Sequence, residues 1–259
     1  MTDFENTLCI QYEYYEQTLA HLLTLKSGVF PAGKNNIIHP LDYCISTALL
    51  GDLLGAIDHL ATNNIVHTRL APEHIYLCAR GPVNWLKIGH FESAVALVNR
   101  LDVPGKCQQQ FGVFDDLDEK VPLCLAKYMA PEVVRNIGYN TSADMYSVGA
   151  IAEYMFGLNI TETARSRITF TDHSIPRNYC RKLYDIVEKM SDKDRSLRPT
   201  ARRVLATQSE YVVYDYLDVN SVPIKSIVMS NSHFFDNPFV QKYLAHKLAL
   251  NMVAEVVVA

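Results

Sequence analysis

The sequence lacks the features that mark several common classes of protein. Glycine and proline are scarce, at 11 residues each among 259, which excludes a collagen-like chain. Basic residues are not in excess, since 24 lysines and arginines stand against 28 aspartates and glutamates and the net charge is −4. Nucleic-acid-binding domains usually have a basic excess, so we expect no nucleic-acid partner. The hydrophobic content of 49% predicts a globular fold.

Paired cysteines and long apolar runs are also missing. The cysteines form no C-x-x-C pair and no Cys/His cluster with zinc-finger spacing; they lie at Cys9, Cys44, Cys78, Cys107, Cys124 and Cys180. We therefore expect reduced thiols in a cytoplasmic protein and no metal site. No basic-then-apolar leader opens the chain, and no continuous apolar run approaches the roughly 18 residues that cross a bilayer, so we expect no membrane partner.

A glycine-rich phosphate loop is the third absence. The glycines are spread singly and no segment has the form G-x-G-x-x-G, so backbone amides cannot be gathered around a nucleotide phosphate in the usual way. We expect no nucleotide cofactor and no other cofactor.

Hydrophobic periodicity predicts a mainly helical α+β fold. Apolar residues recur at helical spacing over 17–26, 45–64, 143–156, 183–190 and 239–248. Short strands are expected at 7–13, 75–77 and 85–88, the last two as a hairpin, so the prediction is two or three strands. Residues 93–127 lose periodicity and contain an acidic run, which predicts a long exposed loop.

Several motifs together resemble the protein kinase family. Residues 65–75 have the sequence IVHTRLAPEHI, similar to the kinase catalytic loop I-V-H-R-D-L-K-P-E-N-I. Further along, 86–92 (LKIGHFE) resembles the strand and D-F-G turn, 128–132 (YMAPE) the A-P-E motif, and 144–149 (DMYSVG) the helix after it. The resemblance implies a structural role in the kinase C-lobe for His67, Ala130, Pro131, Glu132, Asp144 and Arg198, with Arg198 pairing with Glu132.

The resemblance covers residues 7–207 and begins at what looks like the last N-lobe strand and the hinge. It implies that residues 1–207 form a hinge and C-lobe lacking most of the N-lobe, including the glycine-rich loop and the strand-three lysine. Residues 208–259 would be a C-terminal extension, to which the sequence assigns no fold beyond the helix near its end.

The positions that perform catalysis in the family have different chemistry in this chain. Arg69 stands where a carboxylate accepts the substrate proton, and Ala71 where a lysine stabilises the transferring phosphoryl group. The metal-binding asparagine and aspartate correspond to His74 and His90, and Glu92 replaces the turn glycine. Neutral imidazoles suit transition metals more than magnesium, but a cationic Arg69 nearby and no evident third ligand argue against a metal.

With the scaffold retained and the catalytic positions changed, the sequence predicts an inactive pseudokinase and no catalytic residue. Two alternatives remain open. One is serine/threonine kinase activity with atypical catalysis and ATP binding; the other is a decayed or truncated kinase gene product.

The first residues suggest a partner. Residues 9–19 (CIQYEYYEQTL) are similar to the hinge of kinases that phosphorylate the alpha subunit of translation initiation factor 2, and truncated mimics that pair with such kinases have a similar architecture. The resemblance therefore implies a protein kinase as partner, with this chain acting as a decoy or allosteric modulator. We expect Leu8, Ile10 and Tyr12 to lie along an unpaired strand edge that binds the partner. The alternative is that the N-terminus or the apolar tail folds back as a cover.

Overall fold

The longest helix, α2 (Pro40–Thr62), lies at the centre of the computed structural model. Pro40 occupies its first turn, where the fixed φ of proline is helical and its missing N–H leaves no partner unsatisfied. His39 caps this end, because its Nδ1 accepts a hydrogen bond from the backbone N–H of Leu41 at 3.1 Å. The helix predicted over 45–64 is therefore confirmed, with an earlier start. Its fully buried side chains include Leu49, Leu50, Leu53 and Leu54.

The structure describes residues 2–4, 7–9, 11–30, 37–78, 86–97, 123–158, 169–170, 177–212 and 222–247. The other helices in these ranges are α1 (Leu19–Val29), α3 (Leu123–Ala126), α4 (Pro131–Val134), α5 (Ser142–Phe156), α6 (Arg177–Met190), α7 (Ala201–Ala206), α8 (Val222–Ser230), α9 (Ser232–Phe235) and α10 (Pro238–Lys247). The strands are β1 (Thr2–Phe4), β2 (Thr7–Cys9), β3 (Ile37–Ile38), β4 (Ile65–Val66), β5 (Ile75–Leu77), β6 (Leu86–Ile88), β7 (Val95–Ala96) and β8 (Thr169–Phe170).

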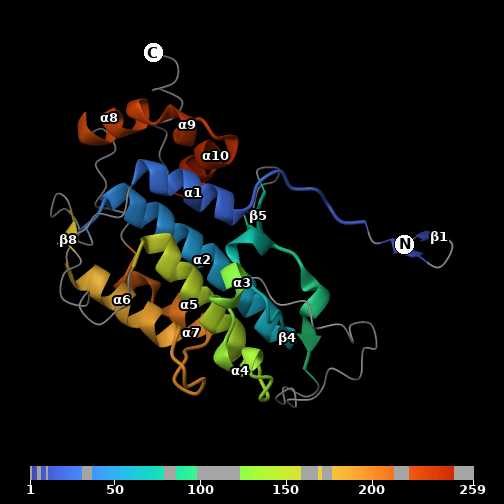
Figure 1. Ribbon diagram of the computed structural model, residues 1–259. Helices are drawn as coiled ribbons and strands as arrows, with labels where there is room; N and C mark the ends of the chain where they lie inside the picture. The colour runs from blue at the N-terminus through green and yellow to red at the C-terminus, as the bar shows by residue number, and fades with distance from the viewer. Residues whose placement is uncertain are drawn as a thin grey trace.

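The helices are arranged in layers around α2. Figure 1 shows α1 along one side of α2 and the helices α5, α6 and α7 along the other. A buried ion pair connects three of these helices, because the Lys26 ammonium on α1 contacts the Asp42 carboxylate on α2 and donates to the carbonyl of Met155 at 2.8 Å. Met155 lies at the carboxyl end of α5, where a cation is favoured by the exposed carbonyl groups. The mainly helical fold class is confirmed.

The strands are more numerous than predicted, but each is only two or three residues long and each has one strand partner. The predicted hairpin is confirmed, since β5 pairs antiparallel with β6 in the register Ile75↔Ile88 and Leu77↔Leu86. Another antiparallel pair joins β4 to β7, and β3 pairs parallel with β8. In the predicted exposed loop, β7 and α3 are ordered elements, and residues 98–122 lie outside the described part.

The N-terminal strand requires a correction. The predicted strand over 7–13 is limited to β2, and β2 pairs with β1 in the register Asp3↔Leu8. One edge of the strand that contains Leu8 is therefore paired, and Ile10 lies outside the described residues. Tyr12 follows in an extended segment with 69% of its surface exposed.

The C-terminal extension folds onto the rest of the chain. Figure 1 shows α8, α9 and α10 outside α1, on the side away from α5. Their aromatic side chains belong to the same hydrophobic core as α2, and the fully buried ones include Phe234, Phe235 and Tyr243. Polar contacts support the packing, because Asn237 donates to Gln17 Oε1 at 3.0 Å and Tyr243 donates to Asp52 at 3.1 Å. The domain boundary at residue 207 stays a prediction.

Helix α2 is also long and apolar enough to span a membrane, with a mean hydropathy of 1.3 over its most apolar window. The same length and composition occur in core helices of globular domains, and α2 is lined with buried residues that face α5 and α7. The packing accounts for the apolar character of this helix.

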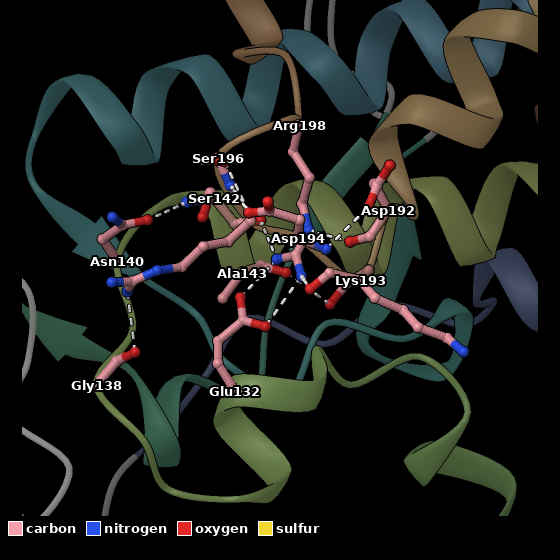
Figure 2. A network of polar contacts seen from close by, with 12 residues as sticks. Glu132, Gly138, Asn140, Ser142, Ala143, Asp192, Lys193, Asp194, Ser196 and Arg198 are labelled. Atoms are coloured by element: carbon pink, nitrogen blue, oxygen red, sulfur yellow. Dashed lines mark hydrogen bonds and ion pairs between the residues drawn. The ribbon is translucent and has the colours of Figure 1, made fainter.

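A buried ion pair braces the end of the fold that contains α4 (Figure 2). The Arg198 guanidinium donates to both carboxylate oxygens of Glu132, at 2.5 and 2.9 Å, and its side chain is fully buried. Arg198 also donates to the carbonyls of Asp192 and Ser142, which ties α4, the start of α5 and the loop before α7 together. The pairing that the kinase resemblance implied for Glu132 and Arg198 is confirmed.

Removing one member of this pair leaves the other charge buried and unpaired. We expect Glu132→Ala to lower the free energy of unfolding by about 3–5 kcal/mol, measured by urea denaturation. The matched control is Asp58→Ala, which breaks the 3.2 Å contact to an Arg202 side chain that is 72% exposed and should cost less than about 1 kcal/mol. Equal losses in the two variants would contradict the brace.

Candidate functional site

A buried carboxylate positions the loop that contains Arg69. Asp144, near the start of α5, accepts hydrogen bonds from the backbone N–H groups of His67 at 2.8 Å and Thr68 at 3.0 Å. Burial raises the pKa of Asp144 to about 6, and these two N–H donors act in the opposite direction because they favour the carboxylate. Thr68 has a φ of +67°, a left-handed conformation that a threonine rarely adopts. The bonds from Asp144 hold this loop in its turn.

Two of the antiparallel strand pairs, β4 with β7 and β5 with β6, bring the separate motifs together. The pairing of β4 with β7 places Thr68 beside Ser93, whose carbonyl accepts a hydrogen bond from the Thr68 hydroxyl at 3.0 Å. The pairing of β5 with β6 places His74 beside Gly89, whose N–H donates to the His74 carbonyl at 2.9 Å. His90 follows Gly89 directly. The catalytic-loop and D-F-G-like motifs therefore meet at one site.

His67 is neutral in this site. Its Nε2 lies 2.7 Å from the Gly89 carbonyl, which can only accept, so Nε2 carries the proton. Its buried Nδ1 has no hydrogen-bond partner among the described residues, so a second proton there would find no acceptor in that part of the chain. Burial also disfavours the charged imidazolium, and this lowers the pKa of His67. The edge of the Phe91 ring packs against the imidazole at a centroid distance of 5.0 Å.

A cavity of about 240 Å³ lies between these segments. It is lined by Arg69, His74, His90, Glu92, Ser93, Leu125 and Met129. Four of the positions that the sequence identified as altered therefore surround one space. The fifth, Ala71, is buried and is not among the lining residues.

His74 and His90 contact each other at this cavity, with ring centroids 4.3 Å apart and the ring planes tilted by 32°. His74 Nδ1 lies 2.7 Å from the Arg69 carbonyl and so donates to it, which leaves the Nε2 lone pair of the neutral ring free. His90 is held from the other side, because its Nε2 contacts the Tyr76 hydroxyl at 2.9 Å and its Nδ1 lies 3.7 Å from Glu92. Burial is the main reason that the pKa of His74 is lowered.

The residues present do not fit the magnesium ions that kinases use. Magnesium prefers carboxylate and other oxygen ligands, whereas imidazoles and a guanidinium dominate this cavity. Within the described ranges, no group of three or more histidines, cysteines, aspartates and glutamates is placed to hold a metal ion. A permanent cation at Arg69 also repels a metal.

The other residues for which the resemblance implied a structural role lie in or beside α4 and α5. Ala130 is buried, Pro131 begins α4, and Glu132 and Asp144 form the buried contacts described above. The partner-binding role of Leu8, Ile10 and Tyr12 stays a prediction.

Sequence reasoning missed Thr68, Tyr76 and Ser93. Tyr76 has only a partial signal in the sequence, because it lies within the strand predicted over 75–77 but its contact with His90 is not marked there. Its ring lies so close to Gly89 that a Cβ there would meet Tyr76 Cε2 at 2.6 Å, which explains why glycine precedes His90. The φ of Thr68 has no such signal.

The lowered pKa of His67 predicts a pH dependence of stability. An unfolded histidine gains a proton near pH 6.5 and the folded His67 does not, so the wild type loses stability as pH falls below 6.5, by at most about 1.4 kcal/mol per pH unit from this group. We expect the difference in unfolding free energy between the wild type and His67→Phe to shrink from pH 7 to pH 5, measured by urea denaturation. Parallel pH profiles would show that His67 titrates normally in the fold.

Comparison with known proteins agrees with this geometry. A profile of the protein kinase domain matches residues 1–211. Among individual relatives, the dual specificity protein kinase YAK1 of Saccharomyces cerevisiae is 28% identical over 157 residues, which is 60% of this chain and 16% of YAK1. The serine/threonine-protein kinase Nek11 of Macaca fascicularis is 30% identical over 160 residues, 59% of this chain and 22% of Nek11.

Over a shorter segment the chain is also similar to the human serine/threonine-protein kinase D2, with 34% identity over 106 residues, which is 40% of this chain and 10% of the relative. This chain thus aligns with less than a quarter of each of these relatives. The family is established by the profile, which covers the catalytic-loop, D-F-G-like and A-P-E motifs whose residues meet at the cavity. The chain belongs to the protein kinase family.

Proposed function

We propose that this chain is a pseudokinase, without phosphotransferase activity, that acts by binding a partner protein kinase as a decoy or allosteric modulator. The observation that carries the proposal is the position of Arg69. Its side chain lines the cavity where the family resemblance places the carboxylate that accepts the substrate proton. A guanidinium stays protonated and has no lone pair to accept a proton, so it cannot act as a general base.

The other substitutions support the same conclusion. Ala71 is a buried methyl group and supplies no charge to a transferring phosphoryl group. His74 and His90 use ring nitrogens to hold the Arg69 carbonyl and the Tyr76 hydroxyl, so these atoms already have partners within the fold. An enzyme lowers its barrier by at least about 8 kcal/mol, mainly through preorganised charge. The charges needed for that are missing or reversed here.

Two features support a protein partner. Tyr12 and Tyr14 are 69% and 83% exposed, and exposed aromatic residues are common anchors in protein interfaces. They belong to the segment that resembles the hinge of kinases acting on translation initiation factor 2 alpha, so we propose such a kinase as the partner.

The alternative is atypical kinase activity, and one observation favours it. Glu92 lines the cavity and is the only carboxylate among the described lining residues. A carboxylate at this place provides a candidate base. Glu92 lies close to His90, and no group of residues in the described ranges is placed to hold a metal ion. Atypical kinase activity is therefore the weaker hypothesis.

Nucleotide binding separates the two hypotheses. A ligand that binds the native state raises the midpoint of thermal unfolding. We expect no change in this midpoint at millimolar MgATP, measured by differential scanning fluorimetry beside an active kinase domain as the positive control. A saturable rise that requires magnesium and disappears in His90→Ala would favour the enzyme.

Partner binding tests the exposed tyrosines. The double variant Tyr12→Ala with Tyr14→Ala removes two exposed anchors, and we expect the Kd for a purified translation initiation factor 2 alpha kinase domain to rise at least about tenfold by surface plasmon resonance. Ile10→Pro should weaken binding further if an added strand forms there. The matched control is Met229→Ala, which changes a residue 70% exposed on α8. Unchanged binding in the tyrosine variant would exclude this segment as the contact.

A further inference from the structure

We propose that the cavity lined by Arg69, His74 and His90 is a metal-independent binding site for a doubly charged tetrahedral oxyanion, the phosphate group of a phosphomonoester or nucleotide. The inference rests on the proposed loss of catalysis at the same place, because the substitutions that remove the base and metal ligands replace them with cationic or protonatable groups. A site that would repel a free phosphate if it contained carboxylates attracts one here.

Arg69 supplies the permanent charge. Its guanidinium has several N–H donors in a planar fork, which matches the oxygens of a phosphate. No carboxylate in the part of the chain that the structure describes forms an ion pair with it. Its backbone is fixed on both sides, since its N–H donates to the His67 carbonyl at 2.9 Å and its carbonyl accepts from His74. Arg69 is therefore held at the cavity wall.

His74 supplies a second donor that depends on the ligand. Because Nδ1 donates to the Arg69 carbonyl, the free Nε2 gains its proton only when the ring becomes an imidazolium. Burial and the neighbouring His90 keep the pKa of His74 low in the free protein. An oxyanion in the cavity favours the imidazolium, so binding takes up a proton and strengthens as the pH falls.

The charges around His74 set the sign of the expected effects. Burial and His90 disfavour its protonation, whereas the hydrogen bond to the Arg69 carbonyl and the carboxylates of Glu73 and Glu92 favour the imidazolium. Glu92 also lines the cavity and repels an anion directly. The effect of Glu92 on the pKa of His74 is smaller than those of burial, the Arg69 hydrogen bond, His90 and Glu73, so its direct repulsion of the anion dominates. Removing this carboxylate should therefore tighten binding, whereas a metal site would lose affinity in the same variant.

The test is an NMR titration of the full chain with sulfate, in EDTA and at constant ionic strength. Sulfate has the shape of phosphate but keeps its double charge over the pH range used. We expect saturable shifts of the Arg69 Nε–H and His74 ring signals, and a Kd at least about tenfold weaker in Arg69→Gln. Arg202→Gln, at an exposed arginine on α7, is the matched control and should bind as the wild type does. Backbone spectra show whether each variant is folded.

Further arms test the mechanism and the source of the anion. The wild-type affinity should rise by up to about tenfold per pH unit as the pH falls from 7.5 to 6, and this rise should vanish in His74→Gln. Tighter binding of a phosphoserine peptide than of sulfate identifies a phosphorylated side chain as the ligand. Tighter binding of ATP without metal identifies a nucleotide. In either case the binding must be lost in Arg69→Gln.

Equal binding of sulfate to the wild type and Arg69→Gln, or no saturable shift, overturns the oxyanion site. Weaker binding in Glu92→Gln also overturns it. Neither result bears on kinase pairing, which is measured separately through Tyr12 and Tyr14, so the failure of the oxyanion site and the failure of the proposed function are distinguishable.

Discussion

The geometry of the site depends on one buried carboxylate. Asp144 comes from α5, a helix that packs on the central helix α2, and it accepts the backbone N–H groups of both His67 and Thr68. This contact transmits the rigidity of the helical core to a loop whose Thr68 adopts a left-handed φ. Without it, the strained turn that precedes Arg69 would lose two of the hydrogen bonds that compensate for its conformation. The orientation of the cavity wall therefore follows from a helix that does not itself line the cavity.

The buried charged groups of this chain are constrained by their partners, whereas the polar groups of the cavity are not. The buried charged groups have partners of opposite charge or hydrogen-bond donors, as in the Glu132 and Arg198 brace, the pair of Lys26 with Asp42, and Asp144. Buried charges without partners cost several kcal/mol, so such contacts are under strong physical constraint whatever the function. The cavity residues are partly exposed and have no such constraint. Catalytic chemistry can therefore change there while the fold persists, and this separation is the physical basis for proposing a binding role.

Much of the fold and part of the site follow from the sequence. The apolar spacing of residues 45–64 predicts α2, and the motif order predicts that His74 and His90 meet, because an antiparallel hairpin joins their positions. The contact of Tyr76 with His90 depends on the directions of the two side chains at one end of that hairpin. The periodicity of the sequence does not specify these directions. The packing of α9 on α1, and the hydrogen bond from Asn237 to Gln17, join residues that lie far apart in the sequence, which no local pattern contains.

The most direct measurement is phosphoryl transfer by the purified full chain with labelled ATP, magnesium and a generic protein substrate. The account predicts transfer no greater than in a sample without protein, for the wild type and for Glu92→Gln and Arg69→Ala alike. Transfer by the wild type that is lost in Glu92→Gln would contradict it, because a working base would then lie in the cavity beside Arg69.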